Sequence, residues 1–552
     1  MRNILKATPG RSAACATNTK PRARRPEVLR LLAVALAGAL LLAASETRDD
    51  ARRWWDHVVF LADDSLEGRD TGSEGYRKAA RYVAGQLERA GMEPAGSQGY
   101  FQPVKFQVRR IDEDHSALFL IRNGISRQLT LGEDAMFSLR SNLRRRIDAE
   151  MVFVGYGLSI PEAGYDDLAG IDLKGKIAVY LSGGPASVAA PLRAHAQSSS
   201  ERWKALHNAG AIGTAAIPNP DSMDIPWDRA KLARLQPSMS LAGRELDATR
   251  TQRFALTINP ARAEPFFEDS GHTFDEIVRL ARENQPLPRF PLRASVRAKV
   301  EVRMNALQSE NVVAVLPGSD PKLKDEYIVL SAHLDHVGVG APVEGDSIYN
   351  GAMDNAAGVA SVIELGRMLQ ESGAKLRRSV IFLLVTGEEK GLLGSRFFAL
   401  QPTVKGRIVA NINLDMFLPI HALTHLVTLG LDESTLGESL RVVASTHGIQ
   451  ILPDPEPQRN LFIRSDQYSF IRQGVPALAF KFGYEKGSPE EQLQREWIKR
   501  RYHAPSDDVH QPVDKDAAVR FNRLMLALVE HVANGTSRPQ WSENSFFKRF
   551  AR

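Results

Sequence analysis

Beyond Glu301, mostly apolar runs of about four to six residues alternate with longer segments of helical periodicity. The runs lack the strict apolar and polar alternation of a half-buried strand, and this is typical of strands covered on both faces. We therefore predict an α/β fold with a mainly parallel sheet and helices on both faces. The predicted strands are 327–330, 380–385, 408–412 and 477–480, and the predicted helices are 356–369 and 517–532.

Two different patterns precede this region. From Ser73 to Gly91 apolar residues recur at helical spacing, with Ser73 placed to cap the helix and Gly91 to end it. From about 148 to 290, short β-rich runs (151–156 and 176–181) are broken by Gly and Pro, and a helix-like segment ends at 209–211. We predict an inserted β-rich domain at 148–290, with 46–147 and 291–552 together forming the main domain.

The first 45 residues have the pattern of an export signal. A basic stretch precedes fifteen uncharged residues, 31–45, which are rich in Leu and Ala and end in Ala43-Ala44-Ser45. A membrane span needs about 20 residues, so we predict a signal peptide cleaved near Ser45. Because the leader before the apolar run is long, an uncleaved N-terminal anchor is the alternative. The expected location is periplasmic or secreted.

Composition and charge exclude several classes of protein. The chain has 552 residues, 43% of them apolar and 25% charged, which is ordinary for a multidomain globular protein. Of the net charge of +6, the excess lies within residues 1–30, so the rest of the chain is close to neutral and nucleic-acid binding is not expected. The single cysteine, Cys15, lies in the leader, which excludes cysteine proteases and Cys-ligated zinc from the mature protein.

Side chains that bind metals gather where the predicted strands end. In open α/β sheets, the carboxyl ends of the strands are where ligands bind. The residues concerned are His333, Asp335 and His336 after the first strand, Glu388 and Glu389 after the second, Asp415 after the third, Asp354 before the first helix, and Tyr502 and His503 near the end.

These segments resemble peptidase family M28, a family of dizinc aminopeptidases. Five motifs occur in the family's order, and the resemblance covers the predicted main domain, 46–147 and 291–552. The insert resembles the protease-associated (PA) domain that many relatives carry at this position, where it acts as a lid or substrate-access surface. The motifs are His333-Leu334-Asp335, Asp354-Asn355, Gly387-Glu388-Glu389, Asn413-Leu414-Asp415 and Tyr502-His503-Ala504-Pro505.

The resemblance implies a role for each of these residues. Three carboxylates, two Zn²⁺ and a shared hydroxide sum to zero charge, as a partly desolvated site requires. Asp335 would orient His333 through the second ring nitrogen, Glu388 would move the proton of the attacking water, and Tyr502 would donate to the oxyanion. The Asp354–Asn355 peptide bond is expected to be cis. The implied zinc ligands are His333, Asp354 (bridging), Glu389, Asp415 and His503.

Other polar residues in the motifs receive weaker roles. His336 is interpreted as a supporting histidine rather than a ligand, and Asp507 as a brace for the His503 loop. Arg464 is expected near the substrate. The family often has His where this chain has Gln467, and this departure leaves substrate preference open.

The leading hypothesis is an exported dizinc exopeptidase that acts on peptides, most consistent with an aminopeptidase. A carboxypeptidase, a dipeptidase or a glutaminyl-cyclase-like zinc enzyme on the same fold is the enzymatic alternative. The alternative from a different class is a non-catalytic receptor-like protein. Such a protein is expected to have lost some metal ligands, whereas all five are present here. A serine hydrolase is disfavoured because no Gly-x-Ser-x-Gly motif ends a strand. The natural substrate and the oligomeric state are not determined by the sequence.

Overall fold

The computed structural model describes residues 47–551 except 142, 224, 244–245, 247–248 and 460. The predicted signal peptide or anchor, 1–45, lies outside the described residues. Within them, no helix is both long enough and apolar enough to cross a membrane.

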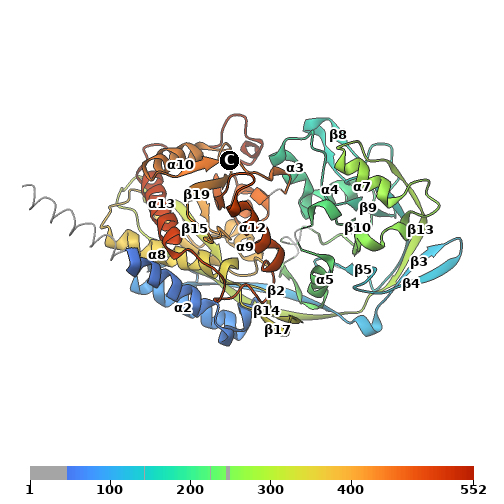
Figure 1. Ribbon diagram of the computed structural model, residues 1–552, viewed down its shortest axis with the longest axis horizontal. Coiled ribbons are helices and arrows are strands. Elements are labelled where there is room, and N and C mark those ends of the chain that lie inside the picture. The colour runs from blue at the N-terminus through green and yellow to red at the C-terminus, as the bar shows by residue number, and fades with distance from the viewer. Residues whose placement is uncertain are drawn as a thin grey trace, which may run out of the picture. The chain divides into compact units, whose positions relative to one another are not determined.

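The main sheet, which includes the strands labelled β15 and β19 in Figure 1, has a parallel centre and antiparallel flanks. The four central strands, β18, β15, β19 and β22, pair in parallel. This confirms the predicted α/β class, while β14, β2, β11 and β20 extend the sheet in antiparallel pairs. In spatial order the strands are β11 (Ser238–Leu241), β2 (Phe101–Ile111), β14 (Val302–Leu316), β18 (Ser379–Val385), β15 (Glu326–His333), β19 (Arg407–Asn413), β22 (Ala477–Gly483), β20 (His425–Leu429) and β21 (Gln450–Leu452), and β1 (Glu93–Pro94) also pairs with β14.

Successive residues of the central strands enter separate cores on the two faces of the sheet. In β18, Val380, Phe382 and Leu384 belong to one core, whereas Ile381 and Leu383 belong to the other. A strand buried on both faces therefore needs a continuous apolar run, as the sequence shows. One core is covered by α2 (Glu74–Arg89), α8 (Ala357–Glu371), α10 (Thr435–Thr446) and α13 (Lys515–Asn534), and the other by α9 (Leu393–Leu400) and α11 (Gln467–Ile471).

Local signals place the ends of α2. The Ser73 hydroxyl accepts a hydrogen bond from the backbone N–H of Tyr76 at 3.0 Å, which satisfies one of the free donors at the helix start. The helix ends at Arg89, two residues before Gly91, whose φ of 78° favours glycine. The predicted helix and its cap are confirmed.

A second, eight-stranded sheet has its own apolar core. Parallel pairing joins β6, β9, β10 and β12, and the remaining pairs are antiparallel. Helices α3 (Ala190–Gln197), α4 (Ser199–Asn208) and α7 (Phe274–Arg282) belong to the same part of the chain. The strands are β4 (Ile125–Leu129), β3 (Ala117–Arg122), β13 (Arg289–Lys299), β6 (Arg146–Val154), β9 (Ile177–Leu181), β10 (Gly213–Ile217), β12 (Phe254–Ile258) and β5 (Ala135–Phe137), in spatial order.

The second sheet does not follow the predicted boundaries of the insert. It takes strands from 117 onward, about 30 residues before the expected start at 148. Conversely, β11, which lies inside the predicted insert, pairs with β2 of the main sheet. The extent of the second sheet depends on which distant segments pair as strands. No local sequence pattern indicates that pairing.

Candidate metal centre

Five side chains from five segments meet at the carboxyl ends of the parallel strands. Nε2 of His333 lies 3.1 Å from Oδ1 of Asp354 and 3.4 Å from Oδ1 of Asp415. Nε2 of His503 lies 3.3 Å from Oδ2 of Asp354 and 3.2 Å from Oε2 of Glu389. The two oxygens of Asp354 therefore face two separate groups of donors.

The electrostatics of this cluster favour bound cations. Asp354 Oδ2 and Asp415 Oδ1 are buried and accept no hydrogen bond from the described residues. Burial by itself would lower the pKa of His333, but the carboxylates of Glu388, Asp354 and Asp415 raise it well above its usual value. The excess of buried negative charge is what a divalent cation would neutralise, and imidazole with carboxylate is a donor set that suits zinc.

The backbone around Asp354 has a distinctive form. Gly351 precedes it with φ 62°, and the Asp354–Asn355 peptide bond is cis, as expected. The carboxylate of Asp507 accepts hydrogen bonds from the N–H groups of Met353 (2.9 Å) and Asp354 (3.0 Å). Asp507 thus braces Asp354 itself rather than only the His503 loop.

Asp335 lies in the site but does not orient His333 through its carboxylate. The ring Nδ1 of His333 donates instead to the backbone carbonyl of Asp335, at 3.0 Å. The Asp335 carboxylate accepts from the hydroxyl of Thr71 (3.0 Å) and from the backbone N–H groups of Glu388 (3.1 Å) and Glu389 (3.3 Å). The predicted contact of Asp335 with the second ring nitrogen of His333 is therefore present, but the backbone carbonyl makes it and not the carboxylate.

The predicted catalytic side chains line one cavity of about 160 Å³ beside the cluster. Glu388 and Tyr502 border it together with His333, Asp354, Asp415 and His503. The ring of Tyr502 packs on that of His503 with centroids 4.1 Å apart, and burial raises the pKa of Tyr502 to about 12. Arg464 also borders the cavity, so the structure brings all the predicted site residues except Asp335 and Glu389 to its wall.

Gln467, which departs from the family pattern, is fully buried on the wall of this cavity. The side-chain amide of Asn413 donates to Gln467 Oε1 at 2.9 Å, and Gln467 Nε2 donates to the Phe462 carbonyl at 3.0 Å. Gln467 therefore links the end of β19, just before Asp415, to the 461–463 turn.

His336 stays close to the cluster without joining either donor group. Its Nδ1 lies 2.8 Å from Oε1 of Glu389 and 4.0 Å from Oδ2 of Asp354. The ring is fully buried. This geometry fits the predicted supporting role.

Arg69, which no sequence pattern indicated, is a fully buried arginine. It joins the loop after His333 to the loop before Asp354. Its guanidinium donates to the carbonyls of Leu334 (2.9 Å), Asn350 (2.6 Å) and Gly351 (3.1 Å), and also to that of Leu61. No local signal marks this role, because the acceptors are backbone atoms far away in the sequence.

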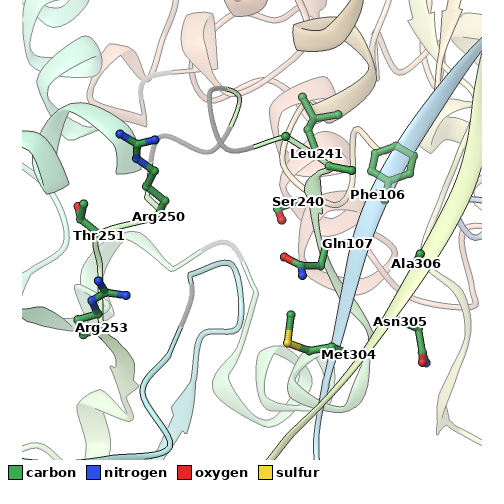
Figure 2. A pocket seen from close by; sticks show the side chains of 12 residues that line it. Phe106, Gln107, Ser240, Leu241, Arg250, Thr251, Arg253, Met304, Asn305 and Ala306 are labelled. Atoms are coloured by element: carbon green, nitrogen blue, oxygen red, sulfur yellow. The ribbon is translucent and has the colours of Figure 1, made fainter.

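A larger hollow of about 960 Å³ lies elsewhere (Figure 2). Gln107 and Met304 lie on one side of it, and Arg250 and Arg253 on the other. Its described lining residues include no His, Asp or Glu. They therefore provide no acidic or imidazole ligand.

The second sheet's helices contact the segment that follows the cavity wall. Nδ1 of His195 in α3 lies 2.8 Å from the hydroxyl of Tyr468 in α11. Arg472 forms an ion pair with Glu201 in α4 at 2.9 Å. These helices thus contact Tyr468 and Arg472, which follow the cavity-lining residue Gln467 in the chain.

Three carboxylates and two imidazoles, buried or partly buried at the carboxyl ends of parallel strands, are the donor set of a metal-dependent enzyme. The sequence model of peptidase family M28 matches residues 311–529, the region that holds all five of these side chains. This region of the chain therefore matches peptidase family M28, as the motifs predict.

Individual relatives agree with this assignment. The chain is 31% identical to the aminopeptidase NAALADL1 of Mus musculus over 139 residues. This aligned stretch is 24% of this chain and 17% of that protein. The chain is 26% identical to the probable leucine aminopeptidase 2 of Aspergillus oryzae over 275 residues. This aligned stretch is 47% of this chain and 52% of that protein. The chain thus spans about half the length, or less, of these curated relatives.

The fold also has a solved counterpart. The aminopeptidase from Aneurinibacillus sp. strain AM-1 is similar over 89% of this chain and 97% of its own, with a TM-score of 0.54 and 20% identity. This similarity supports the architecture of the fold.

Proposed function

We propose that this chain is a zinc-dependent aminopeptidase that removes N-terminal residues from peptides. The observation that carries the proposal is the position of Asp354, whose two oxygens face His333 and His503 separately. This arrangement suits two ions, one held by His333 and Asp415 and one by His503 and Glu389. The names of the curated relatives, an aminopeptidase and a probable leucine aminopeptidase, support the same activity.

Each residue of the cavity would have its own role in peptide hydrolysis. Zinc in such a site supplies Lewis acidity that polarises the peptide carbonyl and activates water. Glu388, which borders the cavity beside the cluster, would accept the proton of the attacking water and pass it to the leaving amine. Tyr502 would donate a hydrogen bond to the developing oxyanion. Asp335 would hold the backbone of Glu388 in place.

The acidic character of the cavity favours binding of the substrate's free α-amine. Glu388 and Asp415 both line the cavity and would attract an ammonium group. The insert contacts Tyr468 and Arg472, close to the cavity wall, through His195 and Glu201, which supports a role in restricting access to short or unfolded peptides. The basic and apolar pattern of residues 1–45 supports an exported location.

The test compares one peptide with a free and with an acetylated N-terminus, and identifies the residues released by mass spectrometry. The free peptide is expected to lose N-terminal residues one at a time, while the acetylated peptide stays intact. Equal cleavage of both peptides, or release from the carboxyl end, would contradict the aminopeptidase proposal. The alanine variant Glu388→Ala serves as the control for a contaminating peptidase.

A further inference from the structure

The cavity beside the metal ligands has an apolar wall interrupted by a lysine. Val427 and Leu429 of β20 lie directly opposite Lys481 and Ala479 of β22, so these side chains belong to paired positions of the same two strands. All four line the cavity. A cavity of about 150 Å³ can hold a benzene molecule, so the 160 Å³ here has room for one side chain.

Lys481 has donor capacity that the protein does not use. Its ammonium donates to the carbonyls of Asp415 (2.9 Å) and Met416 (3.0 Å). An ammonium has three N–H donors, so one remains. No described residue forms an ion pair with Lys481, although the side chain is half-buried.

The two acidic residues on the cavity wall away from the metal ligands, Asp454 and Glu456, bond to other groups. Glu456 pairs with Arg459 at 2.7 Å and with Arg495 at 3.6 Å. Asp454 accepts a hydrogen bond from the Glu456 backbone at 2.9 Å. Lys481 interacts electrostatically with Asp415 and Asp354 of the predicted metal centre, and more weakly with Arg459 and Arg464. The part of the cavity away from the metal ligands therefore has an excess of positive charge.

We propose that this pocket binds a substrate carboxylate beside the cleaved bond, and that Lys481 is the specificity-determining residue. The inference rests on the proposed aminopeptidase function. Under that function the carboxylate is the side chain of an N-terminal Glu or Asp. A C-terminal carboxylate would have the same chemistry, so the experiment separates the two sources.

The first arm measures kcat/KM for glutamyl, leucyl and lysyl anilides with the wild type, Lys481→Gln and Lys481→Arg. Glutamine retains N–H donors but no charge, and arginine retains the charge. We expect the wild type to prefer the glutamyl anilide. Lys481→Gln should lower the glutamyl-to-leucyl ratio by about 10- to 100-fold, the range for one charged hydrogen bond, and Lys481→Arg should largely restore it. The exposed Lys486→Gln is the matched control and should leave the ratio unchanged.

The second arm measures cleavage of N-acetyl-leucyl-leucine and of its C-terminal amide, which differ only in the C-terminal carboxylate. Cleavage of only the free acid, sensitive to Lys481→Gln, would reject the aminopeptidase function but support a carboxylate pocket with a C-terminal source. Cleavage of leucyl or lysyl anilides in preference to glutamyl, with no change of ratio in Lys481→Gln, would overturn the inference and leave the aminopeptidase function standing.

Two further measurements do not depend on turnover. Calorimetry should show tighter binding of L-glutamate than of L-leucine to the wild type, and this difference should disappear in Lys481→Gln. Zinc content should be equal in all variants. If Lys481→Gln loses zinc and all activities in parallel, Lys481 only braces the turn at Asp415, and the inference is wrong. Equal binding of the two amino acids by the wild type would overturn it as well.

Discussion

Nε of Arg69 donates to the carbonyl of Leu334 at 2.9 Å, across 265 positions of the chain. Leu334 lies between the ligand His333 and Asp335, and the same guanidinium also donates to Asn350 and Gly351, just before Asp354. One buried side chain from the N-terminal part of the domain thus joins two loops of the metal centre.

Replacing Arg69 should therefore damage both folding and metal binding. Arg69→Met leaves four buried carbonyls without their donor, and each unsatisfied group costs about 1 to 3 kcal/mol. We expect a loss of at least about 3 kcal/mol in the free energy of unfolding and weaker zinc binding. Arg69→Lys should recover only part of the loss, because an ammonium cannot reproduce the planar fork.

Urea unfolding and zinc titration against a chelator measure the two effects. The control is Arg81→Met, which removes an exposed arginine paired with Glu74 and should change stability by less than about 0.5 kcal/mol. Normal stability and zinc affinity in Arg69→Met would show that the loops are held by other contacts.

Metal content is predicted to be about two zinc ions per chain, by the usual two-metal arrangement. Because Asp354 faces both donor groups, Asp354→Asn should lower the content of both ions. His333→Ala and His503→Ala should each remove mainly one. Elemental analysis after dialysis gives the count. One metal per fully active chain would favour the cyclase-like alternative.

The two adjacent glutamates should respond differently to substitution. Glu388→Ala is expected to keep the fold and the zinc while lowering turnover by about 10² to 10⁴. Glu389→Ala should lose zinc, because its carboxylate lies 3.2 Å from His503 within the donor cluster. Steady-state kinetics together with metal analysis separate these outcomes. Zinc loss in Glu388→Ala would mean that the two roles are reversed.

His195 should make stability depend on pH. Burial lowers its pKa to about 4; of the nearby charges, Glu201 and Glu162 raise the pKa, and Arg472 and Arg549 lower it. Between pH 6.5 and 4 the unfolded chain binds a proton at His195 and the folded protein does not. Stability should therefore fall as the pH is lowered through this window, by roughly 3 kcal/mol in total, and be unaffected by this group above it.

The measurement is the urea midpoint at pH 7.5 and pH 5 for the wild type and His195→Gln. The variant should lose less stability at pH 5 than the wild type, because glutamine does not titrate. His115→Gln, at a side chain that is 68% exposed, is the control and should follow the wild type. Identical pH dependence in the wild type and His195→Gln would contradict the prediction.

The structure and the sequence agree most closely on the central strands. The runs 327–330, 380–385, 408–412 and 477–480 lie within β15, β18, β19 and β22, because burial on both faces requires continuous apolar residues. His333 ends β15, while Glu388 and Asp415 follow β18 and β19 within three residues. The placement of these side chains at one edge of the sheet could therefore be predicted.

The sequence by itself thus determined the strands, the ligand types and their position at the strand ends, since these depend on neighbouring residues. Only the tertiary structure decided the contacts of Asp335, Arg69, Asp507 and Lys481, and the extent of the second sheet. The side chains of these four residues bond to backbone N–H or carbonyl groups, mostly of distant segments. Every residue carries such groups, so no residue pattern reveals which of them will meet; the folded chain alone brings them together.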